Sequence, residues 1–123
     1  MIAVLMGGYS AEREISLLSG KAVYDALCNS KLDCFVFDLT KDNLDELWSR
    51  EFDQAFIVLH GRGGEDGFIQ SELEKNNILY TGSGAKASEL CMDKAATKDL
   101  WNNHNLPLSA SVVATKGKDL NTI

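Results

Sequence analysis

Fold class follows from one stretch at the start of the chain, Ile2-Ala3-Val4-Leu5-Met6-Gly7-Gly8-Tyr9-Ser10. Its apolar part is continuous rather than alternating, which is typical of a strand buried on both faces of a parallel sheet. After the glycine turn, Ser10 is the expected N-cap of a helix, and Glu12 then lies in its first turn, where the helix dipole favours a negative charge. The helix is predicted by apolar side chains at the spacing of one inward-facing stripe, namely Ile15, Leu18, Ala22, Val23, Ala26 and Leu27.

The same strand–helix pattern recurs along the chain. We expect further strands over residues 34–37, 55–59 and 78–80, and helices over about 42–50, 68–75 and 93–103. In the helix over 68–75, the side chains expected to face inward are Phe68, Ile69 and Leu73. Strands that alternate with helices predict right-handed βαβ crossovers, and therefore a three-layer α/β/α fold with a mostly parallel sheet.

The end of the chain does not continue this pattern. Pro107 breaks the last helix, residues 111–114 have the apolar character of a strand, and residues 119–123 have the pattern of a helix start. We therefore expect an α/β domain over residues 1–107 and the severed start of a further domain over 108–123. Without a partner, a severed segment of this kind is expected to fray.

Composition limits the class of protein. The 123 residues are 45% apolar and 24% charged with a net charge of −6, which is typical of one globular domain with a single core. The acidic balance disfavours nucleic acid as a partner, because phosphate binding needs clustered Lys and Arg. No apolar run approaches the ~20 residues of a membrane helix, so we expect no membrane insertion and a cytoplasmic location.

The three cysteines, Cys28, Cys34 and Cys91, show no C-x-x-C spacing and are odd in number. A disulfide scaffold is therefore not expected, nor is a cysteine metal site. All three stand among apolar residues, which favours reduced thiols buried as small hydrophobic side chains.

Two glycine-rich turns follow strands, at residues 7–14 and 60–67. In a parallel sheet, ligands bind beyond the carboxyl ends of the strands, so both turns are expected to border one crevice. There Glu12 is either a first-turn helix acid or an anchor for an ammonium group. His60 is about equally a structural residue or an acid/base group. For Glu65 and Asp66, the helix-capping interpretation is favoured.

A third turn, over residues 82–87, fits the G-x-G-x-x-A outline of dinucleotide-binding loops. It follows the fourth strand rather than the first, so a simple turn and helix start is favoured. Two alternatives nevertheless stay open at this point: a nucleotide-cofactor oxidoreductase domain using this turn, and a binding domain without chemistry.

Taken together, residues 7–17 (Gly7-Gly8-Tyr9-Ser10-Ala11-Glu12-Arg13-Glu14-Ile15-Ser16-Leu17) and 60–70 (His60-Gly61-Arg62-Gly63-Gly64-Glu65-Asp66-Gly67-Phe68-Ile69-Gln70) resemble the two N-terminal signatures of D-alanine–D-alanine ligases. The resemblance continues through residues 80–84, 92–94, 97–98 and 105–107, in the family's order. Departures are small: Tyr9 stands where Thr is common, and Ser71 where Gly is common.

The resemblance implies a Rossmann-like pre-ATP-grasp domain that binds substrate, inactive on its own, whose catalytic ATP-grasp core would lie beyond Ile123. It implies an enzyme that uses ATP and Mg²⁺ to join two D-alanines through an acyl phosphate, for peptidoglycan precursor synthesis, and that dimerises through this domain. In that reading Glu12 binds the ammonium of the first D-alanine, His60 contacts substrate and takes part in catalysis, and Lys94 reaches the nucleotide phosphates. Gly63 and Gly64 would bring main-chain N–H groups to the reacting carboxylate. No metal ligand is expected within this chain.

Overall fold

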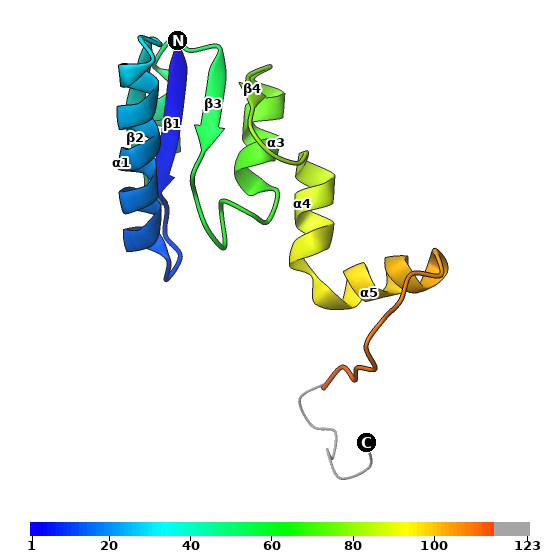
Figure 1. Ribbon diagram of the computed structural model, residues 1–123. Helices are drawn as coiled ribbons and strands as arrows, with labels where there is room; N and C mark the ends of the chain where they lie inside the picture. Colours follow the sequence, from blue (N-terminus) through cyan, green and yellow to red (C-terminus); the bar gives the residue numbers. More distant parts are fainter. Residues whose placement is uncertain (115–123) are drawn as a thin grey trace.

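The computed structural model describes residues 1–114, and Figure 1 shows their arrangement. The helix start expected at 119–123 lies outside the described residues. The elements in chain order are β1 (Ile2–Gly7), α1 (Arg13–Asn29), β2 (Cys34–Leu39), α2 (Leu44–Trp48), β3 (Gln54–Ile57), α3 (Phe68–Lys75), β4 (Leu79–Tyr80), α4 (Ala85–Met92) and α5 (Lys94–Asn103).

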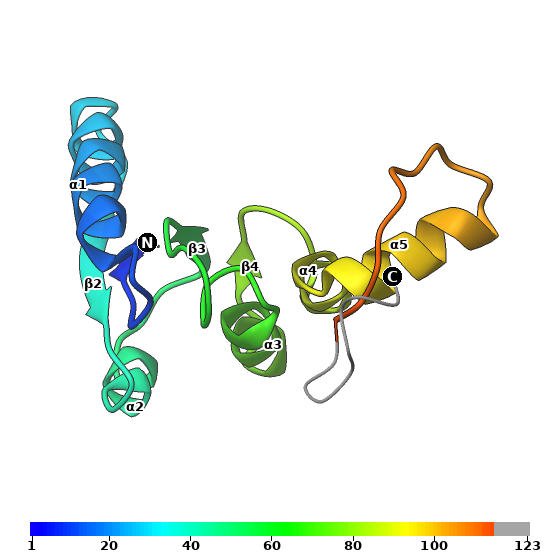
Figure 2. The ribbon, with the colours of Figure 1, turned by 90° about the horizontal axis from the view of Figure 1, so that it is seen from below.

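The strands form one sheet in the order β2-β1-β3-β4, and all its pairs are parallel. In Figure 2, α1 covers one face of the sheet, while α2 and α3 cover the other. The predicted three-layer α/β/α fold with a parallel sheet is therefore confirmed. The parallel arrangement brings the carboxyl ends of β1 and β3, and the turns that follow them, to the same edge.

The core lies between the sheet and the helices α2 and α3. Leu5 of β1, Leu47 of α2, and Ile69 and Leu73 of α3 are fully buried within it. The expectation that Phe68 also faces inward is wrong, because 43% of its side chain is exposed. Ile69 and Leu73 are four residues apart and set the inner face of α3, and Phe68 is about 100° away from Ile69 around the helix.

Helix α1 packs on the sheet by a different face from the one its apolar stripe predicts. The fully buried residues of α1 are Ser16 and Gly20, whereas Ile15 and Leu18 are 57% and 69% exposed. A Cβ placed on Gly20 would lie 2.5 Å from the Cβ of Met6 in β1. The small residues allow the helix backbone to approach the strand closely, and this contact overrides the apolar stripe.

The start of α1 also differs from the prediction. Its N-cap is Glu12 rather than Ser10. Ser10 still contributes, since its Oγ accepts a hydrogen bond from the Glu12 N–H at 3.1 Å and its carbonyl accepts one from Arg13 N–H at 3.2 Å. The helix therefore begins after a short turn, and Glu14 rather than Glu12 is the acid of its first turn.

The last helices, α4 and α5, extend away from the sheet (Figure 1), and neither contains a buried residue. The strand expected over residues 111–114 does not form. Within residues 1–114, no helix is long and apolar enough to cross a membrane.

The expectation that the cysteines are buried is wrong. Cys28 and Cys91 are exposed and Cys34 is half-buried, although all three are free thiols. Cys28 and Cys91 occupy the last turns of α1 and α4, and Cys34 is the first residue of β2. Residues at the ends of helices and strands are covered by fewer neighbouring side chains than residues at their centres. Apolar neighbours in the sequence do not reveal this difference.

Candidate functional site

The two glycine-rich turns meet at Gly61. A Cβ placed on Gly61 would lie 2.7 Å from the Glu12 Oε2 and 3.0 Å from the Ser10 Cβ. The Glu12 carboxylate therefore lies directly against the backbone of the residue that follows His60. Gly61 has a φ of +64°, so the position is suited to glycine for two reasons, the backbone conformation and the lack of space. The two turns therefore meet at this edge of the sheet.

Arg13 fixes the turn that carries Glu12. Its guanidinium makes two hydrogen bonds to the Asp38 carboxylate, at 2.8 and 2.6 Å, and a third to the Gly8 carbonyl at 3.0 Å. Asp38 raises the pKa of Arg13 through these hydrogen bonds. Arg13 therefore links the turn after β1 to the end of β2.

Ser16 joins the two strands that lead into the site. Its side chain is fully buried, and its Oγ donates to the Val58 carbonyl at 2.6 Å and accepts from the Gly7 N–H at 2.9 Å. Gly7 ends β1 and begins the first turn, and Val58 stands two residues before the second turn. Sequence reasoning missed this residue, because Ser16 lies outside the apolar stripe that was expected to face inward.

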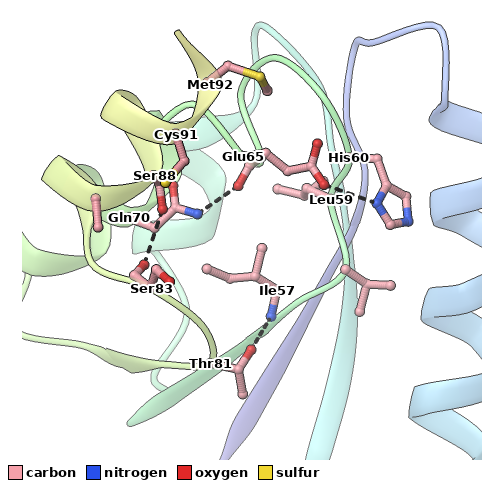
Figure 3. A pocket seen from close by; sticks show the side chains of 13 residues that line it. Ile57, Leu59, His60, Glu65, Gln70, Thr81, Ser83, Ser88, Cys91 and Met92 are labelled. Carbon is pink, nitrogen blue, oxygen red and sulfur yellow. Dashed lines mark hydrogen bonds and ion pairs between the residues drawn. The ribbon is translucent and has the colours of Figure 1, made fainter. Parts of the chain in front are cut away.

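His60 follows β3 and lines a cavity of about 520 Å³ between the end of β3 and α4 (Figure 3). Its Nδ1 lies 3.8 Å from Glu65 Oε1, and the other Glu65 oxygen accepts the Gly61 N–H at 2.8 Å. The cavity wall opposite His60 carries hydroxyls of Thr81, Ser83 and Ser88. Glu12 is not among the lining residues, so it borders the His60 turn from outside this cavity.

Gln70 is a second residue that sequence reasoning missed. Only 6% of it is exposed, and its Nε2 donates to the Gly64 carbonyl at 2.7 Å. Its Oε1 has no hydrogen-bond partner among the described residues. Figure 3 shows the amide at the cavity wall.

The N–H groups of Gly63 and Gly64, which the resemblance assigns to the reacting carboxylate, are engaged within the turn. Gly63 N–H donates to Asp66 Oδ2 at 3.0 Å, and Gly64 N–H donates to the Gly61 carbonyl at 3.2 Å. Steric crowding also requires glycine at both positions. A Cβ on Gly63 would lie 2.5 Å from the Tyr9 hydroxyl, and one on Gly64 would lie 2.7 Å from the Leu59 carbonyl carbon. The fold of the turn thus accounts for both positions.

The capping expectation for Asp66 and Glu65 is only partly met. The N-cap of α3 is Gly67, yet Asp66 Oδ1 accepts the N–H of Phe68, the first residue of the helix, at 3.2 Å. Glu65 instead accepts from Gly61 inside the turn. Both acids stabilise the turn through backbone N–H groups.

Lys94 opens α5 and borders a second groove, which it shares with Tyr9 of the first turn and Arg62 of the second. The structure therefore brings Glu12, His60, Gly63 and Gly64 to one edge and places Lys94 beside them. Residues 1–114 contain no cluster of three or more His, Cys, Asp or Glu side chains that could hold a metal ion.

The turn over residues 82–87 leads directly into α4, whose N-cap is Gly84. This is the simple turn and helix start that the sequence favoured, at the edge strand β4 rather than after β1.

Comparisons with known proteins find relatives of one kind. A family described as D-ala D-ala ligase N-terminus matches residues 1–49. Curated D-alanine–D-alanine ligases of Vesicomyosocius okutanii and Ruthia magnifica are 57% and 60% identical over all 123 residues. The chain spans 42% of the length of each of these relatives.

Solved structures lead to the same family. The Bacillus anthracis D-alanine–D-alanine ligase complexed with ATP superposes with a TM-score of 0.84 at 33% identity, over 98% of this chain and 41% of that one. A structure of the Aeromonas hydrophila ligase gives 0.83 at 27% identity, over 98% of this chain and 52% of that one. In sequence and in fold, this chain is similar to the N-terminal part of D-alanine–D-alanine ligases.

Proposed function

We propose that this chain forms the substrate-binding side of an ATP-dependent ligase that joins two D-alanines for peptidoglycan precursor synthesis. The observation that carries the proposal is the contact between the Glu12 carboxylate and the turn that begins with His60. It combines an ionised acceptor and an imidazole at the strand edge where parallel sheets bind ligands. The names of the relatives supply the substrate class.

In the proposed site, Glu12 binds the ammonium group of the first D-alanine. A carboxylate suits this role, because it is ionised at neutral pH and accepts charge-assisted hydrogen bonds. The Arg13–Asp38 pair and the Ser16 hydroxyl hold the turn in place, so that the carboxylate is oriented before substrate arrives. Orientation of this kind lowers the entropy cost of binding.

His60 stands one residue before Gly61, against which the Glu12 carboxylate lies, and in the proposed site it contacts the same substrate. Its exposed fraction of 33% leaves the imidazole accessible. For Gly63 and Gly64 to donate to the reacting carboxylate, their N–H groups would first have to leave Asp66 and the Gly61 carbonyl.

We further propose that Lys94 contacts the phosphates of ATP. The groove that Lys94 borders is also lined by Tyr9 and Arg62 of the two turns. An ammonium group is a point charge suited to phosphate oxygens. We assign no Mg²⁺ ligand to residues 1–114, which lack a suitable cluster. A cytoplasmic location, where ATP is available, belongs to the same proposal.

A homodimer formed through α1 is also part of the proposal. Ile15 and Leu18 present exposed apolar side chains on this helix, and burying them would remove apolar surface from water. A charged substitution, Leu18→Glu, is expected to shift the sedimentation of a dimer to that of a monomer without loss of helix content.

A chimera tests the enzymatic proposal. Residues 1–114 of this chain replace the matching part of the 60% identical Ruthia magnifica ligase, and ADP release is measured against D-alanine concentration. We expect dipeptide formation. Glu12→Gln should raise the KM for the first D-alanine about 10- to 100-fold, since a hydrogen bond to a charged group is worth about 1.5–3 kcal/mol.

The matched control is Glu14→Gln, an exposed acid of the same helix turn, which should leave that KM unchanged. An active chimera in which Glu12→Gln and Glu14→Gln behave alike would remove Glu12 from its proposed role. A folded chimera that makes no dipeptide, when the parent ligase does, would refute the proposal as a whole.

A further inference from the structure

Two thiols far from the candidate site lie in contact. The Sγ atoms of Cys28 and Cys34 are 3.6 Å apart, and both cysteines are free. Cys28 belongs to the last turn of α1 and Cys34 is the first residue of β2, so the pair sits at the amino ends of the strands. The glycine-rich turns occupy the opposite edge of the sheet, at the carboxyl ends of β1 and β3.

The backbone holds the two cysteines in this relation. The connection between them turns at Lys31, which has a φ of +59°. Hydrogen bonds fix it at both ends: Lys31 N–H donates to the Cys28 carbonyl at 2.9 Å, and Ile2 N–H donates to the Asp33 carbonyl at 2.9 Å. In the parallel pairing of β1 with β2, Cys34 lies opposite Ile2. The contact between the sulfurs is therefore imposed by the α1–β2 corner.

The two thiols differ in their surroundings. Cys28 is exposed, whereas Cys34 is half-buried. Desolvation raises the pKa of Cys34, and the neighbouring Cys28 thiol raises it further. An exposed thiol next to a less accessible one is the arrangement in which the first reacts with a reagent from solution and the second then displaces that reagent.

We propose that Cys28 and Cys34 form a dithiol modification site that low-molecular-weight disulfides, such as glutathione disulfide, oxidise to an intramolecular disulfide. The Cys28 thiolate attacks one sulfur of glutathione disulfide and releases one glutathione thiolate, leaving a mixed disulfide on Cys28. The Cys34 thiolate then attacks the Cys28 sulfur and releases the second glutathione. Overall, the two protein thiols lose two electrons and two protons, and glutathione disulfide is reduced to two glutathiones.

Closure requires a small movement. A disulfide bond is about 2.05 Å long, and rotation about the two Cα–Cβ bonds can bring sulfurs in contact to that distance. Cys91 provides an internal comparison, because it lies on α4, across the sheet from the α1–β2 corner (Figure 1). Its mixed disulfide has no neighbouring thiol to resolve it among residues 1–114, which contain all three cysteines.

The test is oxidation of the 123-residue chain in glutathione redox buffers, followed by intact-mass and peptide-mass analysis. We expect loss of two hydrogens between Cys28 and Cys34, and a glutathione adduct confined to Cys91. Cys28→Ser and Cys34→Ser should each retain a glutathione adduct on the remaining partner. Cys91→Ser, the matched control, should become fully oxidised without any adduct.

Sequence proximity alone could favour this pairing, so the same equilibrium is measured in the chain unfolded with urea. We expect the effective concentration of the two thiols to be about tenfold or more higher in the folded chain, since the fold holds them in contact. Equal values in the folded and unfolded chains would overturn the proposal, as would a stable glutathione adduct on Cys28 in the folded wild-type chain.

Discussion

The sheet unit, residues 1–80, and the helical arm, residues 85–114, use their apolar side chains in opposite ways. All the buried apolar residues of the core, from Ala3 to Leu73, belong to the sheet unit. The arm buries none of its helical residues, and Leu100 and Trp101 remain 39% and 44% exposed. The sheet unit thus has its own core, while the arm depends on local hydrogen bonds and on a few contacts at its base.

The junction between the two regions is polar. Glu74 of α3 accepts hydrogen bonds from the Tyr80 hydroxyl and from the Ala85 N–H at the start of α4. Gly67, with a φ of +86°, allows the Ala85 carbonyl to approach so closely that a Cβ would lie 2.5 Å from it. Such a junction positions the arm without adding to the core, so the two regions should respond differently to substitution.

The largest expected difference is between Leu73→Ala and Leu100→Ala. Leu73 is fully buried, so its truncation should lower the free energy of unfolding by about 2–5 kcal/mol. Leu100 is the matched leucine of the arm, and its truncation should cost under about 1 kcal/mol. Urea unfolding followed by circular dichroism measures both. Equal losses would show that the arm shares the core and would break the comparison.

A smaller effect is expected from Ser16→Ala. The substitution leaves the Gly7 N–H and the Val58 carbonyl without their buried partner, which should cost about 1–3 kcal/mol. Ser19→Ala, on the same helix but only half-buried, is the control and should change the unfolding free energy little. If the two alanine variants were equally stable, the hydroxyl would not be joining β1 to β3.

Asp93→Ala should destabilise the arm alone. The Asp93 carboxylate accepts the N–H groups of Ala95 and Ala96 at 2.9 and 3.0 Å, and loss of an N-cap costs about 1 kcal/mol. Hydrogen exchange should therefore quicken at these two amides while the amides of β1 and β3 keep their protection. Faster exchange in the sheet as well would mean that both regions unfold as one unit.

The smallest expected effect is a pH dependence of the junction between the sheet unit and the arm. The hydrogen bond from Tyr80, followed by that from Ala85, lowers the pKa of Glu74. A lowered pKa in the folded state contributes stability above the pKa of the unfolded chain, and this contribution is lost as the pH falls through the folded value. Protection of the Ala85 amide should therefore decline below about pH 4.5. Glu74→Gln should abolish this dependence, and an unchanged profile would contradict the role of Glu74.

The success of sequence reasoning depended on the kind of signal. Continuous apolar runs located β1 and β3, because a strand buried on both faces has no polar positions to confuse the pattern. The prediction of which face of α1 points inward was wrong, because close packing through Ser16 and Gly20 outweighed the burial of Ile15 and Leu18. In the site, Glu12 and His60 could be chosen by residue type, but Ser16 and Gln70 could not, since their roles depend on backbone carbonyls that only the folded chain brings to them.

The order of strands and helices, the two glycine-rich turns at one sheet edge and the likeness to ligases were all determined by the sequence alone. These properties depend on local periodicity and on short motifs, and both can be recognised from the amino-acid sequence without knowledge of long-range contacts. Only the tertiary structure decided that the Glu12 carboxylate lies over Gly61, that the turn uses its own N–H groups and that two thiols touch. Each of these depends on how closely two distant backbones approach, which is set by packing.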